Sequence, residues 1–181
     1  MNLLNLIPYY RKYHEMLGQR DHYKALAETW MNQCLAMQPP DPPEIVGLLS
    51  VNEIIELYVE CFPSIMPDLN YHMLVLDGTY QLTTMDEVRR FVEWDNTNLF
   101  KYVPDILDCD DFAAHLWGAF AIPGWSGLPV ALVVGGGHAF CSVVALGEDG
   151  EPHIHFIEPQ TDFEIAYETM EGQPVRWIMF H

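Results

Sequence analysis

Basic residues are scarce in this chain. Lys and Arg number 8 against 26 Asp and Glu, and the formal net charge is −18 over 181 residues. So much negative charge repels polyanions, which disfavours nucleic acid and anionic membranes as partners. Cationic peptides or metal ions are favoured instead, although acidity of this kind also serves solubility alone.

Three further absences narrow the class of protein. No apolar run approaches the roughly 20 residues of a membrane span, and the run Leu3–Ile7 is too short, and followed by the wrong sequence, for a signal peptide. No Cys-x-x-Cys pair is present, which argues against a zinc ribbon or a disulfide scaffold. We therefore expect a cytoplasmic protein with free thiols. The four cysteines are Cys34, Cys61, Cys109 and Cys141.

The length and the 50% hydrophobic content fit one ordered domain with a small appendage. Residues 7–37 show helical periodicity, and the proline-rich run at 38–43 ends that pattern. The sequence predicts an N-terminal helical segment with its linker over residues 1–43. A second domain is expected over residues 44–181.

The pattern from residue 44 onward predicts an α+β domain. Ser50 or Asn52 caps one predicted helix that ends at Cys61, and Thr84 with Glu87 forms a capping box for another that ends at Trp94. The Asp77–Gly78 turn predicts a hairpin between residues 71–76 and 79–82. Four further strands are expected to form a small antiparallel sheet, at residues 129–134, 139–146, 153–157 and 175–180.

Cys109 is a candidate nucleophile. It lies in the run Asp108-Cys109-Asp110-Asp111-Phe112-Ala113, from which apolar residues recur at helical spacing. The thiol is therefore expected in the first turn of a helix, where unpaired N–H groups and the helix dipole stabilise a thiolate. The alternative is a buried structural cysteine.

His138 is the candidate base, because it follows three glycines and opens an apolar strand. The turn at residues 147–152 makes the next strand antiparallel, and this brings Glu158 back toward His138 as the group that orients it. Asp162 is an alternative for that role. His138 could also be a core histidine bonded to a carbonyl.

These elements resemble the papain-like cysteine peptidases in the transglutaminase-like order, in which a Cys helix precedes strands that carry His and an acid. Within that superfamily they resemble the papain-like C-terminal domain of a mushroom agglutinin, in the run Asp108–Ala113, the segment Gly135–His138 and Glu158-Pro159-Gln160. The resemblance covers roughly residues 69–162. It implies a papain-like fold in which the Cys helix packs on the sheet.

The resemblance also implies that activity depends on Ca²⁺ or a similar cation such as Mn²⁺, with Asp110 and Asp111 as ligands. A cation would also relieve the carboxylates around Cys109, whose charge otherwise raises a thiol pKa. Asp110 and Asp111 could instead simply complement the helix dipole, and Asp108 could be the N-cap.

One departure concerns the oxyanion hole. Papain-type enzymes carry a Gln six residues before the nucleophile, and position 103 is Val. The second donor would then be Gln160 or an amide of the Tyr102–Leu107 loop. We expect a cysteine hydrolase (a thiol protease) acting on a peptide or isopeptide amide of a protein substrate, or a non-catalytic binding module with the same fold.

Two other groups of residues are considered for a chemical role. His153 and His155 alternate along a predicted strand and could share a zinc ion, but the sequence supplies no obvious third ligand. Cys141, on the strand of His138, is expected in the core.

Overall fold

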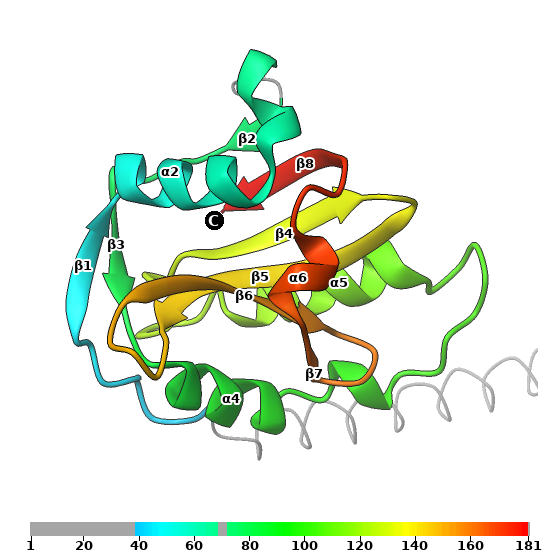
Figure 1. The fold of residues 1–181 in the computed structure, drawn as a ribbon. Helices are drawn as coiled ribbons and strands as arrows, with labels where there is room; N and C mark the ends of the chain where they lie inside the picture. The colour runs from blue at the N-terminus through cyan, green and yellow to red at the C-terminus, as the bar shows by residue number, and fades with distance from the viewer. Residues whose placement is uncertain (1–38, 69–71, 181) are drawn as a thin grey trace, which may run out of the picture. The chain divides into compact units, whose positions relative to one another are not determined.

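The computed structural model describes residues 39–68 and 72–180. Residues from Pro40 onward form one compact unit, drawn in Figure 1. The helices expected at 7–37 lie outside the described residues. Within the described ranges no helix has the length and apolar character that crossing a membrane requires.

A six-stranded mixed sheet forms the centre of the unit, with strand order β2-β8-β4-β5-β6-β7. All neighbouring strands are antiparallel except β2 and β8, which run parallel. A separate pair, β1 with β3, completes the strands of the described region. The strands are β1 (Gly47–Ser50), β2 (Met73–Leu74), β3 (Thr79–Leu82), β4 (Val130–Gly135), β5 (His138–Leu146), β6 (Pro152–Glu158), β7 (Phe163–Ile165) and β8 (Val175–Phe180).

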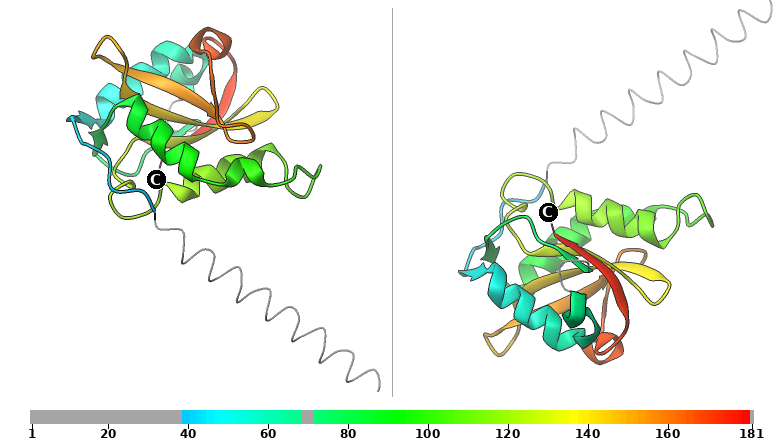
Figure 2. Two further views of the ribbon diagram at one scale, coloured as in Figure 1. Left: turned by 90° about the horizontal axis from the view of Figure 1, so that it is seen from below. Right: turned by 90° about the horizontal axis from the view of Figure 1, so that it is seen from above.

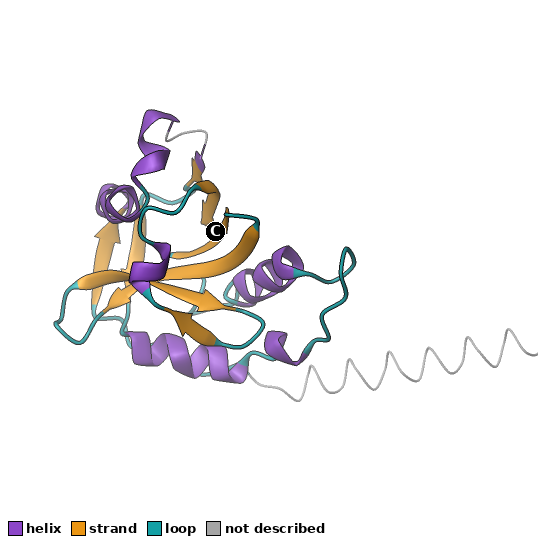
Figure 3. Cartoon of the chain, turned by 45° about the vertical axis from the view of Figure 1, so that its right-hand side comes forward, coloured by secondary structure: helices purple, strands orange, loops and turns teal. Residues whose placement is uncertain are grey.

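Helices cover both faces of this sheet, as Figures 2 and 3 show. One core joins α2 to Phe140, Val144 and their neighbours, and the other joins α4 and α5 to Ala139 and Cys141. Successive residues of β5 therefore serve opposite cores, as a strand buried on both faces requires. The α-helices of the described region are α2 (Val51–Cys61), α4 (Met85–Trp94), α5 (Cys109–Ala119) and α6 (Tyr167–Met170).

The expected hairpin between residues 71–76 and 79–82 is wrong. Met73 pairs with Ile178 of β8, whereas Leu82 of β3 pairs with Gly47 of β1. An isolated two-stranded hairpin is only marginally stable. At the edge of the large sheet Met73 is buried in the same core as Ile178, and that burial outweighs the local turn.

The helix starts follow the sequence closely. Ser50 caps α2 in a full capping box with Glu53, and the Thr84 hydroxyl accepts the N–H of Glu87 at the start of α4. The expected box at Thr84 is only half formed, because the Glu87 carboxylate pairs with Arg90 instead. Charged partners compete successfully for a partly exposed first-turn carboxylate.

Pro40 and Asp41, in the proline-rich segment, contact the rest of the compact unit. The Pro40 carbonyl accepts a hydrogen bond from Trp125 Nε1 at 3.2 Å, and the Asp41 carbonyl accepts one from Arg90 at 3.0 Å. The Arg90 guanidinium also lies 5.2 Å from the Trp125 ring centroid. This segment is therefore held by specific contacts.

Candidate functional site

Cys109 is the first residue of α5, as expected. Asp108 is the N-cap, and its N–H donates to Asp111 Oδ2 at 3.2 Å. Phe112 N–H then donates to the Asp108 carbonyl at 3.0 Å, which begins the helical ladder. The N–H groups of the first turn have no acceptor within a helix, so the half-buried Cys109 lies where an anion is stabilised.

His138 is the first residue of β5, immediately after the β4–β5 turn. Gly136 and Gly137 have φ values of +60° and +82°, the left-handed conformation that a two-residue hairpin turn needs. Gly135 pairs with His138 across the turn. The glycines therefore fix the position of the imidazole at the end of the sheet.

Glu158 holds the His138 ring. Glu158 is the last residue of β6, and its Oε2 lies 2.6 Å from His138 Nε2. The Gln160 N–H donates to Glu158 Oε1 at 3.2 Å, so both carboxylate oxygens are engaged. This pairing directs Nε2 toward the carboxylate and leaves Nδ1 for a substrate or a thiol. The imidazole is 40% exposed, which allows access to it.

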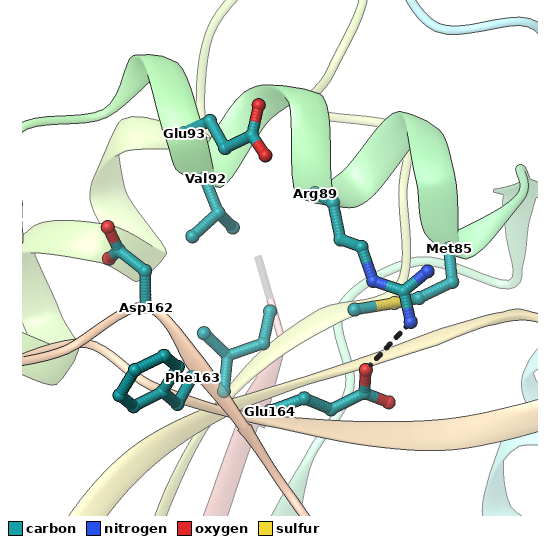
Figure 4. A pocket seen from close by; sticks show the side chains of 8 residues that line it. Met85, Arg89, Val92, Glu93, Asp162, Phe163 and Glu164 are labelled. Carbon is teal, nitrogen blue, oxygen red and sulfur yellow. Dashed lines mark hydrogen bonds and ion pairs between the residues drawn. The ribbon is translucent and has the colours of Figure 1, made fainter.

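Asp162, the alternative acid, is held elsewhere. Its Oδ2 accepts a hydrogen bond from Asn98, and no described contact joins it to His138. Burial, together with the charge of Asp95, raises the Asp162 pKa to about 6. Asp162 lines a pocket of about 260 Å³ between α4 and the β6–β7 turn, where Arg89 pairs with Glu164 (Figure 4).

The structure does not join Cys109 to the His138–Glu158 pair. Among the described residues no hydrogen bond links Cys109 Sγ to His138. The His138 ring lies beside Phe140, at 6.2 Å between centroids, whereas α5 packs on the face of Ala139 and Cys141. The start of α5 and the tip of the β4–β5 hairpin do lie at the same end of the sheet (Figures 1 and 2).

Three amides of the loop before Cys109 already have acceptors and are not free for an oxyanion hole. The N–H groups of Val103, Ile106 and Leu107 all donate to carbonyls within the loop, at 2.9, 3.1 and 2.8 Å. The residue at its tip, Asp105, has φ of +61°. The N–H groups at the start of α5 are candidate backbone donors beside the thiol.

The two predicted metal ligands have different surroundings. Ligand atoms of Asp108, Cys109 and Asp110 lie within 4.8 Å of one another. A hydrogen bond between the carboxyl groups of Asp108 and Asp110 raises the pKa of Asp110. Asp111 lies outside this group, because its carboxylate accepts the N–H of Asp108.

The histidines of β6 are not a zinc pair. His153 Nε2 lies 2.8 Å from Asp149, and His155 Nδ1 lies 2.6 Å from Glu164. Over residues 39–68 and 72–180, the one group of three possible metal ligands is that at Cys109. Each histidine therefore has a carboxylate of its own, and sequence alternation alone could not reveal this.

Comparison with solved structures identifies proteins with a similar fold. No family model matches the chain, and no curated protein matches it. A solved structure of PSL1a in complex with E64 matches with a TM-score of 0.60 and 22% identity, over 74% of this chain and 51% of that one. A Polyporus squamosus lectin bound to the human-type influenza-binding epitope Neu5Acα2-6Galβ1-4GlcNAc matches with a TM-score of 0.56 and 22% identity, over 74% and 49%.

The chain spans about half the length of these two proteins. A TM-score of 0.60 shows a shared fold, and an identity of 22% leaves activity open. The matched structures agree with the α+β architecture expected from the motifs around Cys109, His138 and Glu158. The sheet is mixed and not purely antiparallel as expected, because β2 joins β8 in parallel. The chain thus has the papain-like fold of a domain found in a Polyporus squamosus lectin.

Proposed function

We propose that this chain is a cysteine hydrolase that cleaves or transfers peptide or isopeptide amides. The observation that carries the proposal is the 2.6 Å contact between His138 Nε2 and Glu158 Oε2. A carboxylate that fixes the tautomer and the orientation of an imidazole is what a general base requires. The partly exposed imidazole is suited to exchange a proton with a substrate.

Each residue has a defined role in this proposal. Cys109 attacks the carbonyl carbon, and His138 Nδ1 takes the thiol proton and returns it to the leaving amine. Glu158 keeps the proton on Nε2, and the first-turn N–H groups of α5 bind the oxyanion. The mechanism requires Cys109 Sγ to approach His138 on substrate binding, since catalytic hydrogen bonds are often formed only in the complex.

A hard cation would act beside the thiol, and the donor set at Cys109 fits a weak site. Asp108 and Asp110 together offer four carboxylate oxygens, fewer than the six to eight that Ca²⁺ prefers. These two residues would hold Ca²⁺ or Mn²⁺, and Asp111 would keep its role in the helix cap. The bound cation would offset the negative charge around Cys109.

A second candidate function is a non-catalytic binding module. Two observations favour it: Cys109 makes no hydrogen bond to His138 among the described residues, and Val103 stands where papain-type enzymes carry Gln. In that case the fold would present a binding surface, and the thiol would have ordinary reactivity.

Thiol alkylation separates the two functions. We would measure, by intact mass, the rate at which Cys109 reacts with iodoacetamide and with E64, the compound bound to PSL1a. If His138 activates the thiol, His138→Ala should slow both reactions by at least roughly tenfold, and Glu158→Gln should slow them less. Asp162→Asn is the matched control and should leave both rates unchanged.

Equal rates in the parent and in His138→Ala would contradict the hydrolase and favour the binding module. Slower reaction in Asp162→Asn with no change in Glu158→Gln would move the orienting role to Asp162. As a second readout, Cys109→Ala should abolish any cleavage of a mixed peptide library. Its cooperative unfolding should remain, because the sulfur lies at the start of a helix.

A further inference from the structure

A β-bulge lies beside the β4–β5 turn. Val134 pairs with Trp177 and Gly135 with Val175, so Arg176 is an extra residue of β8 with no partner in β4. A bulge re-aims a side chain, and bulges are frequent next to functional sites. A Cβ at Gly135 would lie 2.6 Å from the Pro174 carbonyl oxygen, so the close approach of β8 requires glycine at position 135.

The bulge is held in place from its other side. His72 Nδ1 lies 2.9 Å from the Arg176 carbonyl oxygen, which must accept, so the ring donates from Nδ1. An open groove of about 430 Å³ runs along the bulge, lined by Gly135–Gly137, by His72 and by Pro174–Arg176. The lining of the groove thus combines glycine backbone with the Arg176 guanidinium and the His72 ring.

Arg176 differs from the other arginines of the described region. Arg89 pairs with Asp86 and Glu164, and Arg90 pairs with Glu87. Arg176 is exposed and forms no ion pair with a carboxylate in residues 39–68 and 72–180. In a chain with 26 acidic residues, an arginine that lies on a bulge without a carboxylate partner is a site that attracts an anion.

We propose that this groove binds a carboxylate of a peptide through Arg176. The planar guanidinium can hold a carboxylate through two parallel hydrogen bonds, which gives orientation as well as affinity. Gly137, which lines the groove, directly precedes His138, so a peptide anchored here would lie near the imidazole. The identification of this peptide as the substrate rests on the proposed hydrolase function. The binding of its carboxylate by Arg176 does not depend on that function.

The test measures binding without turnover. Calorimetric titration would use the full chain with Cys109→Ala, at about 0.15 M salt to screen long-range repulsion. Three peptides of equal length are compared: one with a Glu side chain and an amidated end, one neutral with a free C-terminal carboxylate, and one neutral and amidated. We expect a carboxylate peptide to bind at least roughly tenfold more tightly than the fully neutral one.

Three substitutions locate the effect. Arg176→Gln should remove the preference for the carboxylate peptides, whereas Lys101→Gln removes the same unit of charge from an exposed side chain outside the groove and should preserve it. Gly135→Ala, which displaces the bulge, should also weaken the preference. The two carboxylate peptides show whether the groove takes a side chain, a chain terminus or both.

Equal binding of all three peptides, an unaltered preference in Arg176→Gln, or an equal loss in Lys101→Gln would each overturn the proposal. None of these results bears on the hydrolase function, which the alkylation of Cys109 judges separately. Fast His138-dependent alkylation with no carboxylate preference would leave a hydrolase whose peptide binds elsewhere.

Discussion

Cys141 Sγ donates a hydrogen bond to the Ala113 carbonyl oxygen at 3.2 Å. Cys141 lies three residues after His138 on β5, and Ala113 lies four residues after Cys109 on α5. This contact therefore ties the strand of the proposed base to the helix of the proposed nucleophile. The expectation that Cys141 belongs to the core is confirmed.

Removal of this contact should affect both stability and the reactivity of Cys109. Cys141→Ala leaves a small cavity between α5 and β5, and we expect the free energy of unfolding to fall by about 1–2 kcal/mol. The helix should also shift relative to His138, so the alkylation rate of Cys109 should change. Urea denaturation and intact-mass kinetics measure the two effects.

Cys61→Ala is the control for this prediction. Cys61 is fully buried in the core of α2, away from α5, and burial raises the pKa of its thiol to about 11. Its removal should lower stability by a similar amount without changing the reaction of Cys109. An equal change in alkylation rate in the two variants would contradict the role given to Cys141.

Asp162 should make stability depend on pH. The folded pKa of about 6 lies above the ordinary value, so the folded state binds more protons and stability falls as pH rises from about 4 to about 6. Asp162→Asn removes this loss and keeps an acceptor for Asn98. The variant should match the parent below about pH 4 and be more stable by about 1 kcal/mol above about pH 6, after allowance for solvent screening.

Urea denaturation of both proteins at a series of pH values checks this prediction. Asn also tolerates the positive φ of +59° at this position, so the substitution adds no backbone strain. A stability difference that stays constant from pH 4 to pH 7 would show that Asp162 does not titrate in this range.

Calcium should stabilise the folded chain through Asp108 and Asp110. A ligand that binds only the folded state raises the melting temperature as its concentration rises. Asp110→Asn should abolish this rise. Asp111→Asn should keep it, because Asp111 serves the helix cap, although the helix start itself should become slightly weaker.

Thermal melts in calcium, in manganese and in strong chelator, for the parent and both variants, check this prediction. If the melting temperature does not depend on the cations, Asp108 and Asp110 bind no cation and serve only as charges at the helix start. Loss of the rise in Asp111→Asn as well as in Asp110→Asn would support the ligand set that the sequence resemblance implies.

Local signals in the sequence were sufficient for most of the elements. Ser50 and Thr84 mark helix starts because their hydroxyls accept first-turn N–H groups, and Cys109 begins a helix as expected. The turn at residues 147–152 predicts the β5–β6 pairing, in which Leu146 lies opposite Pro152. That pairing brings Glu158 to His138. The contact between these two residues, which are distant in sequence, was therefore predicted from one turn.

Features that depend on contacts between residues distant in sequence could not be predicted. The β2–β8 pairing unites residues about 100 positions apart, and nothing near Met73 in sequence indicates it. The partner of His153 is Asp149, which lies in the predicted turn, although the pattern did not indicate the contact. The partner of His155 is Glu164 in β7, a strand that the pattern did not predict. The bulge at Arg176 depends on the register between β4 and β8. A one-residue shift of register cannot be recognised from the residue types alone.

The hydrogen bonds of Pro40 and Asp41 set a limit on how the chain can be shortened. A truncated protein that starts at Glu44, where the proline run ends, would lose the acceptors of Trp125 Nε1 and of one Arg90 N–H group. Trp125 is fully buried, and an indole N–H without an acceptor there costs about 1–3 kcal/mol. A fragment intended for structural work should therefore begin before Pro40, so that residues 40–43 remain part of the folded unit.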